Sequence, residues 1–392
     1  MSFAKLTKLT LLLLVGTLVA QAAQAQTFSV YYAFQGGLDG AYPYARPLIE
    51  KGNVWCTTNQ GGQNDSGTAQ VLVGGKPWLV THMSGQTGIF PTADLTWSGG
   101  KAYGVNFWSG NYGSGTIFRW YIQKNKAQFN VLYAFQNGLD GQQPNGTLVR
   151  DTAGNLYGTT SDGGAGSAGT LFKLDPSGNL TVLYTFGADA ARPRGNLVRD
   201  AKGNFYGTTQ IGGAYGYGTV FKFDASGNET IIHSFTGGSD GGYPYGGVIR
   251  DAKGNLYGTT YQGGDLVNCP GGIGCGVVFK IDKKGKETVL YTFTGYDGRA
   301  PVGTLLLDKA GNLYGTTSYG GESDIYYWGT VFKLDPAGKE TLLHVFTGYS
   351  DGAYPMAGLT MDKSGNLWGT ASLGGYESDG SNGYGVIFEI TP

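Results

Sequence analysis

Histidine, cysteine and methionine are scarce in this chain. Its 392 residues include three His, three Cys and four Met. His82, His233 and His344 fall in different copies of a repeat described below, so they cannot converge on one point. A histidine-based metal site needs several ligands around one ion, and a Ser-His-Asp triad needs its members in hydrogen-bond contact. The sequence therefore predicts no metal, no cofactor and no catalytic residues built on histidine.

Charged residues are also few, and neither sign dominates. Asp, Glu, Lys and Arg together make up 14 % of the chain, and the formal net charge is -1. Domains that bind nucleic acid usually carry a basic patch or stripe. We therefore expect no nucleic-acid partner.

Long apolar runs are confined to the N-terminus. Lys5 and Lys8 precede an apolar segment, 9–20, that is too short to span a bilayer comfortably. Ala23-Gln24-Ala25 fits a signal-peptidase site. These features predict a signal peptide over 1–25, cleaved after Ala25, and one mature domain over 26–392 without a membrane span. We expect an exported monomer, periplasmic or extracellular.

Export permits disulfide bonds. Cys269 and Cys275 bracket five residues of one loop, and we predict that they form a local disulfide. Cys56 replaces a repeat glycine within a predicted strand. We interpret Cys56 as a small buried apolar residue. A nucleophilic role is the alternative, but no His or Asn lies near it in the repeat.

Glycine, by contrast, is abundant. The chain contains 71 Gly, well above the usual share of about 7 %. Many of them belong to seven copies, some degraded, of the motif G-N-L-Y-G-T-T. The copies are about 48 to 57 residues apart, a period typical of propeller blades. They begin at Gly52, Gly100, Gly154, Gly203, Gly254, Gly311 and Gly365.

Each full repeat contains four strand signals. In the fifth unit they cover 246–251, 255–262, 276–282 and 287–293, and a D-G-x-x-P loop follows. Two tight Asp-x-x-Gly turns join the strands as hairpins. Seven such units predict an all-β fold: a seven-bladed β-propeller with four antiparallel strands per blade. A solenoid also fits the period, but all-β hairpins and uncapped ends argue against it.

The two ends of the chain complement each other. Residues 27–34 resemble a fourth strand with no first three strands before it, and the last repeat ends after its third strand at 386–391. We therefore expect the N-terminal strand to complete the last blade and close the ring. Closure would remove the exposed sheet edges that favour aggregation.

The repeat unit resembles a known family. Its pattern, T-V-L-Y-T-F, D-G-x-x-P, G-x-L-V-R-D-x-x-G-N-L-Y-G-T-T and G-x-G-T-V-F-K-L-D, is similar to the GloVer tandem repeat over 129–392 and 27–60. The resemblance implies an exported bacterial β-propeller. It implies no activity and no catalytic residues.

Three arginines share one position on successive innermost strands: Arg150, Arg199 and Arg250. Leu307 and Met361 replace them in the next blades. If that position faces the central channel, the arginines form a basic arc suited to carboxylate or sulfate groups. The alternative is that each pairs with a neighbouring aspartate.

Two sets of aspartates recur with the repeat, and we interpret both as structural. One Asp per blade leaves neighbours too far apart to share a small cation, and Asp in such turns usually binds its own backbone. A cation-binding ring is the alternative for the first set. The D-G-x-x-P loops hold Asp39, Asp140, Asp189, Asp240, Asp297 and Asp351; the hairpin turns hold Asp151, Asp200, Asp251, Asp308 and Asp362.

Aromatic residues crowd the loops expected on one face of the ring. Rings among Asn, Gly and Ser suit stacking on sugars or contacts with a protein, although they could instead pack between blades. The residues predicted to bind a ligand, together with the three arginines, are Tyr215, Tyr217, Tyr243, Trp328 and Tyr354.

These observations support three hypotheses. The first is a non-catalytic binding module for a glycan or cell-surface protein. The second is a polysaccharide-active enzyme, hydrolase or lyase, whose site differs from its repeat relatives. The third is a structural surface protein. The second needs paired carboxylates about 5–10 Å apart, and the blade-specific acids are Glu50, Asp94, Glu322, Asp324, Glu377 and Asp379.

Overall fold

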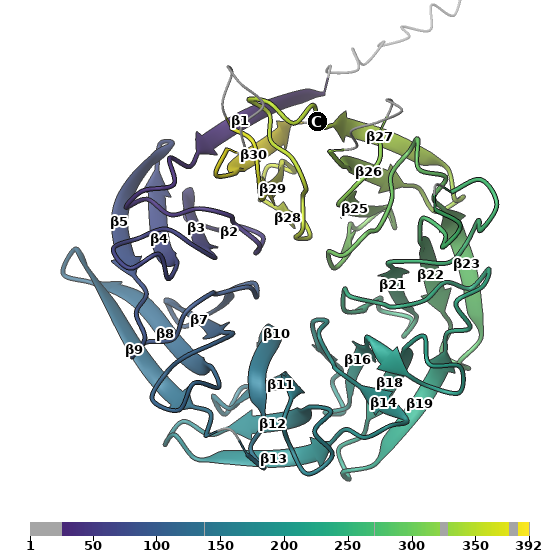
Figure 1. Ribbon diagram of the computed structural model, residues 1–392, viewed down its shortest axis with the longest axis horizontal. Coiled ribbons are helices and arrows are strands. Elements are labelled where there is room, and N and C mark those ends of the chain that lie inside the picture. The colour runs from purple at the N-terminus through teal and green to yellow at the C-terminus, as the bar shows by residue number, and fades with distance from the viewer. Residues whose placement is uncertain (1–25, 137, 270, 322–327, 376–382, 392) are drawn as a thin grey trace, which may run out of the picture.

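Seven four-stranded antiparallel sheets stand around a common axis (Figure 1). This computed structural model describes residues 26–136, 138–269, 271–321, 328–375 and 383–391. Within these ranges the regular structure consists of strands, with no helix. The protein is therefore a seven-bladed β-propeller, as its repeats predict. No described segment forms a helix that is long and apolar enough to cross a membrane.

The blades follow the chain, and each runs from an innermost to an outermost strand. Blades one to three comprise β2 (Leu48–Glu50), β3 (Asn53–Thr58), β4 (Thr68–Val73) and β5 (Lys76–His82); β6 (Thr96–Ser98), β7 (Lys101–Asn106), β8 (Thr116–Gln123) and β9 (Lys126–Ala134); and β10 (Gln142–Arg150), β11 (Leu156–Asp162), β12 (Thr170–Leu174) and β13 (Leu180–Thr185).

Blades four to six repeat this order. They comprise β15 (Val198–Arg199), β16 (Phe205–Thr209), β18 (Thr219–Phe223) and β19 (Glu229–Ser234); β20 (Ile249–Arg250), β21 (Leu256–Thr260), β22 (Val277–Ile281) and β23 (Glu287–Thr292); and β24 (Leu306–Leu307), β25 (Leu313–Thr317), β26 (Thr330–Leu334) and β27 (Glu340–Val345). A two-stranded ribbon, β14 (Ala190–Ala191) with β17 (Ile211–Gly212), joins the entry of blade four to its loop.

Blade seven is built from both ends of the chain. Its inner strands are β28 (Thr360–Met361), β29 (Leu367–Ala371) and β30 (Val386–Thr391), and its outermost strand is β1 (Thr27–Ala33). β1 pairs antiparallel with β30, from Thr27 opposite Thr391 to Ala33 opposite Val386. The predicted closure is confirmed, because β1 supplies the fourth strand that the C-terminal repeat lacks.

The glycine in the middle of the repeat motif makes room for an aromatic ring. A Cβ atom added at Gly158 would lie 2.7 Å from Cζ of Phe172, and one at Gly369 would lie 2.3 Å from Cζ of Phe388. Both phenylalanines are fully buried on the third strand of their blade. The glycine is therefore required by packing, because the ring uses the space a side chain would take.

The aspartate of each hairpin turn holds that turn together. Asp151 accepts hydrogen bonds from the N–H and the side-chain amide of Asn155 and from the hydroxyl of Tyr157. Burial acts to raise the pKa of Asp151, but these hydrogen bonds outweigh it and hold the pKa below its usual value. The same bonds recur at Asp200, Asp251 and Asp308.

Backbone hydrogen bonds join neighbouring blades at the proline of each D-G-x-x-P loop. We call this arrangement the clasp. The residue before that proline has a left-handed backbone. Tyr243, for example, donates its N–H to the carbonyl of Tyr217 in blade four at 2.7 Å and accepts from the N–H of Tyr261 in its own blade at 3.1 Å. The seven residues, with φ between 53° and 58°, are Tyr42, Phe90, Gln143, Arg192, Tyr243, Ala300 and Tyr354.

Candidate functional site

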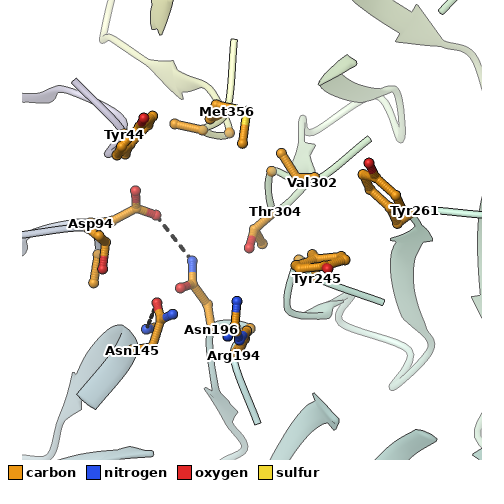
Figure 2. Close-up of a pocket in the computed structure, with 18 residues that line it drawn as sticks. Tyr44, Asp94, Asn145, Arg194, Asn196, Tyr245, Tyr261, Val302, Thr304 and Met356 are labelled. Atoms are coloured by element: carbon orange, nitrogen blue, oxygen red, sulfur yellow. Dashed lines mark hydrogen bonds between the residues drawn. The ribbon is translucent and has the colours of Figure 1, made fainter. Parts of the chain in front are cut away.

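One to three of the residues that directly follow each of these prolines line a hollow on the ring axis. Every blade contributes to it, so it lies at the mouth of the central channel (Figure 2). Its volume is about 370 Å³. We call this hollow the cup. Its lining comprises Tyr44, Thr92, Ala93, Asp94, Asn145, Gly146, Arg194, Gly195, Asn196, Tyr245, Gly246, Tyr261, Val302, Gly303, Thr304, Met356, Ala357 and Gly358.

The cup breaks the symmetry of the repeat. The second residue after the proline is Gly or Ala in every blade, because the backbones of neighbouring blades approach closely there: a Cβ at Gly195 would lie 2.5 Å from the nitrogen of Gly247. The first and third residues differ between blades. In chain order the first is Tyr44, Thr92, Asn145, Arg194, Tyr245, Val302 and Met356, and the third is Arg46, Asp94, Thr147, Asn196, Gly247, Thr304 and Gly358.

Asp94 links four blades through its side chain. Its Oδ2 lies 2.9 Å from Nε of Arg46, and its Oδ1 accepts from the backbone N–H of Arg46 at 2.9 Å. Oδ2 also accepts from Nδ2 of Asn196 at 3.1 Å and from the hydroxyl of Thr147 at 3.3 Å. A carboxylate oxygen has about two lone-pair sites, so Oδ2 is fully hydrogen-bonded whereas Oδ1 accepts one bond, and the side chain keeps 11 % exposure.

Two donors on the same side of the cup as Asp94 are available to a ligand. Arg194 lines the cup, and across the described chain no carboxylate pairs with it and its buried Nε has no hydrogen-bond partner. The side-chain oxygen of Asn145 accepts from the N–H of Gly146 at 2.9 Å, which leaves the amide NH₂ as the free group. An unpaired guanidinium and an amide donor can together bind a carboxylate, or an oxygen that gains negative charge during a reaction.

The opposite side of the cup is aromatic and apolar. Tyr44, Tyr245, Tyr261, Val302 and Met356 surround it, whereas Asp94, Asn145, Asn196 and Arg194 face them (Figure 2). Tyr245 and Tyr261 pack with ring centroids 5.1 Å apart, and Gln210 donates to the hydroxyl of Tyr245. Burial raises the pKa of Tyr261, and the neighbouring hydroxyls of Tyr319 and Tyr245 raise it further.

A second hollow adjoins the cup over blades one, six and seven. Its volume is about 540 Å³, and Tyr44 and Met356 line both hollows. We call it the tyrosine groove. Its lining comprises Tyr42, Tyr44, Gln60, Tyr319, Tyr354, Met356, Ser372 and Leu373.

The three predicted arginines lie away from the cup. Each stands next to a hairpin turn, at the far end of the innermost strand from the proline. There each guanidinium lies over a tyrosine ring of the preceding blade: Arg150 over Tyr103 at 5.5 Å, Arg199 over Tyr157 at 5.7 Å and Arg250 over Tyr206 at 5.7 Å. These contacts tie adjacent blades together. An anion site at these arginines stays a prediction.

The predicted aromatic residues are dispersed over the face. Tyr354 lines the tyrosine groove and packs edge-to-face against Trp328 and Tyr319, with centroids 5.3 Å apart in both pairs. Tyr217 packs against Tyr243 at 5.3 Å, and Tyr215 is 61 % exposed. Apart from Tyr354, none of the five lines either hollow. Their role in binding is also still a prediction.

The cysteines and the acids complete the comparison with the sequence. Cys269 and Cys275 form a disulfide with Cα atoms 5.5 Å apart, and Cys56 is a buried free thiol. The signal peptide and the acids at 322, 324, 377 and 379 lie outside the described residues. Among the residues that are described, no group of three or more His, Cys, Asp and Glu could hold a metal ion.

Five of the six aspartates in the D-G-x-x-P loops bind their own loops. Asp140 accepts from the N–H of Gln136 and the hydroxyl of Tyr133 on the outermost strand. His233 and His344 take the place of that tyrosine, at 3.2 Å from Asp240 and 3.0 Å from Asp351. Asp39, Asp297 and Asp351 likewise accept a backbone N–H of their own loop. These contacts support the structural interpretation of this set.

Sequence reasoning missed Arg194, Asn145 and Asn196, and noted Asp94 only as one of several acids. A signal was present. The prolines at 43, 91, 144, 193, 244, 301 and 355 recur in all seven repeats, and the divergent residues directly after them stand out against that constancy. A single ligand on the ring axis needs different contacts from different blades. Its site is therefore expected at repeat positions where the residues differ between blades.

Three of the solved structures that match this chain illustrate the comparison. One, described as a putative gluconolactonase, has 13 % identity and a TM-score of 0.41 and covers 70 % of this chain and 80 % of its own. A putative 6-phosphogluconolactonase from Bacteroides uniformis has 16 % identity and a TM-score of 0.47, with 76 % and 83 % covered. A gluconolactonase from Xanthomonas campestris has 13 % identity and a TM-score of 0.41, with 89 % and 96 % covered.

The first functional hypothesis is wrong in the light of these structures. It held that the propeller is a non-catalytic binding module, whereas all three are described as lactonases, that is, as enzymes. At these identities the likeness shows the fold alone, so any reaction has to be argued from the cup itself.

The sequence comparisons define the family. No protein of curated function matches the chain. The model of the Gloeobacter/Verrucomicrobia repeat matches residues 14–201 and again 193–392, and so covers nearly the whole sequence. This agrees with the resemblance seen in the repeat unit. The chain belongs to the Gloeobacter/Verrucomicrobia repeat family.

Proposed function

We propose that the protein is a hydrolase that opens a lactone, or an equivalent ester, of a sugar-derived substrate in the cup. One observation carries this proposal. At positions where the repeat diverges, the cup brings a single buried carboxylate, Asp94, together with the unpaired guanidinium of Arg194 and the amide of Asn145. That set can position water and bind a carbonyl oxygen.

The size of the cup favours a small substrate. Its volume of about 370 Å³ is near the lower end of the range of roughly 300–1,000 Å³ in which proteins bind small molecules. One sugar ring fits such a space, whereas a polysaccharide chain needs an extended cleft. The amide, hydroxyl and guanidinium groups on its walls suit a substrate with several hydroxyl groups.

The donor set favours attack at a carbonyl over cleavage of a glycosidic bond. Most glycoside hydrolases need two carboxyl groups about 5–10 Å apart, and the cup is lined by one, that of Asp94. Addition of water to a carbonyl needs donors that stabilise the developing oxyanion and a group that receives the proton of water. Arg194, Asn145 and Asp94 supply these functions.

In the proposed reaction the oxygen of water forms a bond to the carbonyl carbon. The carbonyl π electrons move to oxygen, where Arg194 and Asn145 donate hydrogen bonds, and Asp94 receives the proton of water. Collapse of the tetrahedral intermediate breaks the acyl carbon–oxygen bond of the ring. Asp94 returns its proton to the leaving alkoxide, and the product is a hydroxy acid.

Oδ1 of Asp94 has one donor and can accept a water directly, whereas Oδ2 can accept one only by exchanging a present donor. The longest of its contacts are those from Thr147 at 3.3 Å and Asn196 at 3.1 Å, whereas both contacts from Arg46 are 2.9 Å. Thr147 and Asn196 are therefore the groups that give way if the water binds at Oδ2. Arg46 keeps the carboxylate in place.

The test is proton release from glucono-δ-lactone in a pH-stat, with the spontaneous rate subtracted. Arg194→Gln removes a donor to the oxyanion without breaking a contact in the described structure, and should lower kcat/KM about 100-fold. Arg119→Gln, on the third strand of blade two, is the matched control and should leave the rate unchanged.

Three results would contradict the proposal: no rate above the spontaneous one, equal rates for the two arginine variants, or full activity of a folded Asp94→Asn variant. Circular dichroism and a melting curve establish folding for each variant. Asn145→Ala provides a second donor deletion that leaves the Asp94 contacts intact, so the oxyanion assignment does not depend on one substitution.

A further inference from the structure

The cup has two chemically different sides, and the tyrosine groove extends only one of them. The polar side belongs to blades two to four, with Asp94, Asn145 and Arg194. The groove opens from the aromatic side, past Tyr44 and Met356, which line both hollows. Tyr44 and Met356 lie across the cup from Asn145 and Arg194 (Figure 2), so a substrate whose carbonyl is held at Asn145 and Arg194 would extend toward the groove.

The groove presents tyrosine rings at its surface. Tyr319 is 40 % exposed and packs edge-to-face on Tyr354, with centroids 5.3 Å apart and planes at 68°. Burial raises the pKa of Tyr44, and the hydroxyls of Tyr42 and Tyr319 raise it further. Tyr42, Tyr44 and Tyr319, from blades one and six, all line this hollow.

The groove also carries polar groups that can bind a ligand. The side chain of Gln60 forms no hydrogen bond within the described structure, and it lines the groove. Ser372 donates to the carbonyl of Tyr354 at 2.9 Å, which leaves its hydroxyl lone pairs free to accept. A ligand here meets ring faces, an amide and several hydroxyls.

A pyranose ring matches this combination. Its C–H face can lie on a tyrosine ring, and its hydroxyls can bond to Gln60 and to the tyrosine hydroxyls. A purely apolar or aromatic group would bury these polar groups without partners, which is unfavourable. The volume of about 540 Å³ accommodates one further sugar ring beside the cup.

We infer that the tyrosine groove is a second subsite, and that the preferred substrate is a sugar lactone that carries an additional sugar residue. The inference rests on the proposed function for the reacting ring in the cup. It adds the substrate class: an aldonolactone at the end of a disaccharide or short oligosaccharide. The lactone binds between Asp94 and Arg194, and the attached sugar binds on Tyr319 and Gln60.

The experiment compares glucono-δ-lactone with cellobiono-δ-lactone in the same pH-stat assay. Both contain the same reacting ring, and only the second can reach the groove. Wild-type kcat/KM should be at least about tenfold higher for cellobiono-δ-lactone, and Tyr319→Ala should raise KM for this substrate about fivefold, as expected for loss of one ring contact. KM for glucono-δ-lactone should not change.

Two further variants separate stacking from other effects. Tyr319→Phe keeps the ring and should retain most of the preference. Tyr349→Ala removes another exposed tyrosine, which lines neither hollow, and should behave as wild type. Gln60→Ala tests the polar contact independently of any aromatic packing, and should also raise KM for the larger lactone alone.

Calorimetric titration with gluconate and cellobionate, the two products, separates failure of the subsite from failure of the reaction. Equal turnover of both lactones, unaffected by Tyr319→Ala, would overturn the subsite and leave the proposed function standing. No turnover, but tighter binding of cellobionate that Tyr319→Ala removes, would overturn the hydrolase and keep the subsite. Absence of both turnover and cellobionate binding would overturn both.

Discussion

Asp94 of blade two accepts a hydrogen bond from the side-chain amide of Asn196 of blade four, across the mouth of the ring and 102 positions away in the chain. Asn196 also accepts from the N–H of Thr147 at 2.8 Å, so it bridges blades two, three and four. Polar contacts between the blades thus form part of the floor of the cup. The same residues stabilise the ring and shape the candidate site.

Loss of this bridge should cost stability as well as change the cup. Asn196→Ala removes two hydrogen bonds at a largely buried place, and we expect the free energy of unfolding to fall by about 2 kcal/mol. Asp94→Ala also leaves Arg46 without its partner and should cost about 3 kcal/mol. Urea unfolding measures both. Asn130→Ala, on an exposed part of β9, is the control. If it lowers the free energy of unfolding as much as Asn196→Ala does, the bridge does not contribute specifically to stability.

Ring closure should depend on Phe28 of β1. Its ring stacks on His344 at 3.6 Å and lies 5.5 Å from Phe388 of β30. Phe28→Ala should lower the free energy of unfolding by about 2 kcal/mol, and Val30→Ala, 37 % exposed on the same strand, by less than about 0.5 kcal/mol. Deletion of 26–33 should expose the edge of β30 and produce oligomers in light scattering. A monodisperse, equally stable deletion variant would contradict this role.

Two glutamates on the outermost strands should make stability fall toward neutral pH. Burial, and then the charge of a neighbouring aspartate, raises the pKa of Glu287 to about 7 and that of Glu340 to about 7. The folded state therefore binds these protons more tightly than the unfolded chain. Their contribution is full below the unfolded pKa of about 4.5 and is lost as pH rises through 7.

The double variant Glu287→Gln/Glu340→Gln tests this sign. Its melting temperature should exceed that of wild type at pH 8, and the difference should vanish near pH 4.5. Glu50→Gln, at the end of the innermost strand β2, is the control. The opposite result would contradict this assignment. In that case the melting temperature of wild type would rise from pH 5 to pH 8, and the double variant would lose this rise.

The left-handed residue before each proline should carry a conformational cost. A left-handed backbone costs an L-residue roughly 1–2 kcal/mol, and Arg192 adopts it, with φ 56°, while its side chain is exposed. Arg192→Gly should therefore raise the free energy of unfolding by about 0.5–1 kcal/mol. Arg192→Ala keeps the strained backbone and should not. Chemical denaturation that finds the two variants equal would show that the clasp carries no strain there.

Much of the fold is local in origin and was predictable for that reason. The Asp-x-x-Gly turn at 151–154 is held by bonds between Asp151 and Asn155, four residues apart. Glycines such as Gly158 repeat because one phenylalanine of the same blade needs their space. Even the closure by β1 was visible, since 27–34 continues the repeat where the last copy stops.

The candidate site was not predictable in the same way. Arg150, Arg199 and Arg250 were singled out because they share one repeat position, yet that position lies at the hairpin end of the innermost strand, away from the cup. Arg194 lies only five residues before Arg199 but at the other end of the strand. Repeat spacing alone does not show at which end of the innermost strands the side chains from different blades come together on the ring axis.

The sequence by itself determined the number of blades, their strands and turns, and the closure of the ring, because each depends on contacts within one repeat or between adjoining repeats. Only the tertiary structure decided which divergent residues meet. Asp94, Asn145 and Arg194 are about 50 residues apart in sequence, and they become neighbours because seven wedge-shaped sheets close around one axis. Closure of the ring brings equivalent positions of all seven repeats to the same wall of the cup. Residues that differ between the repeats therefore form one asymmetric site.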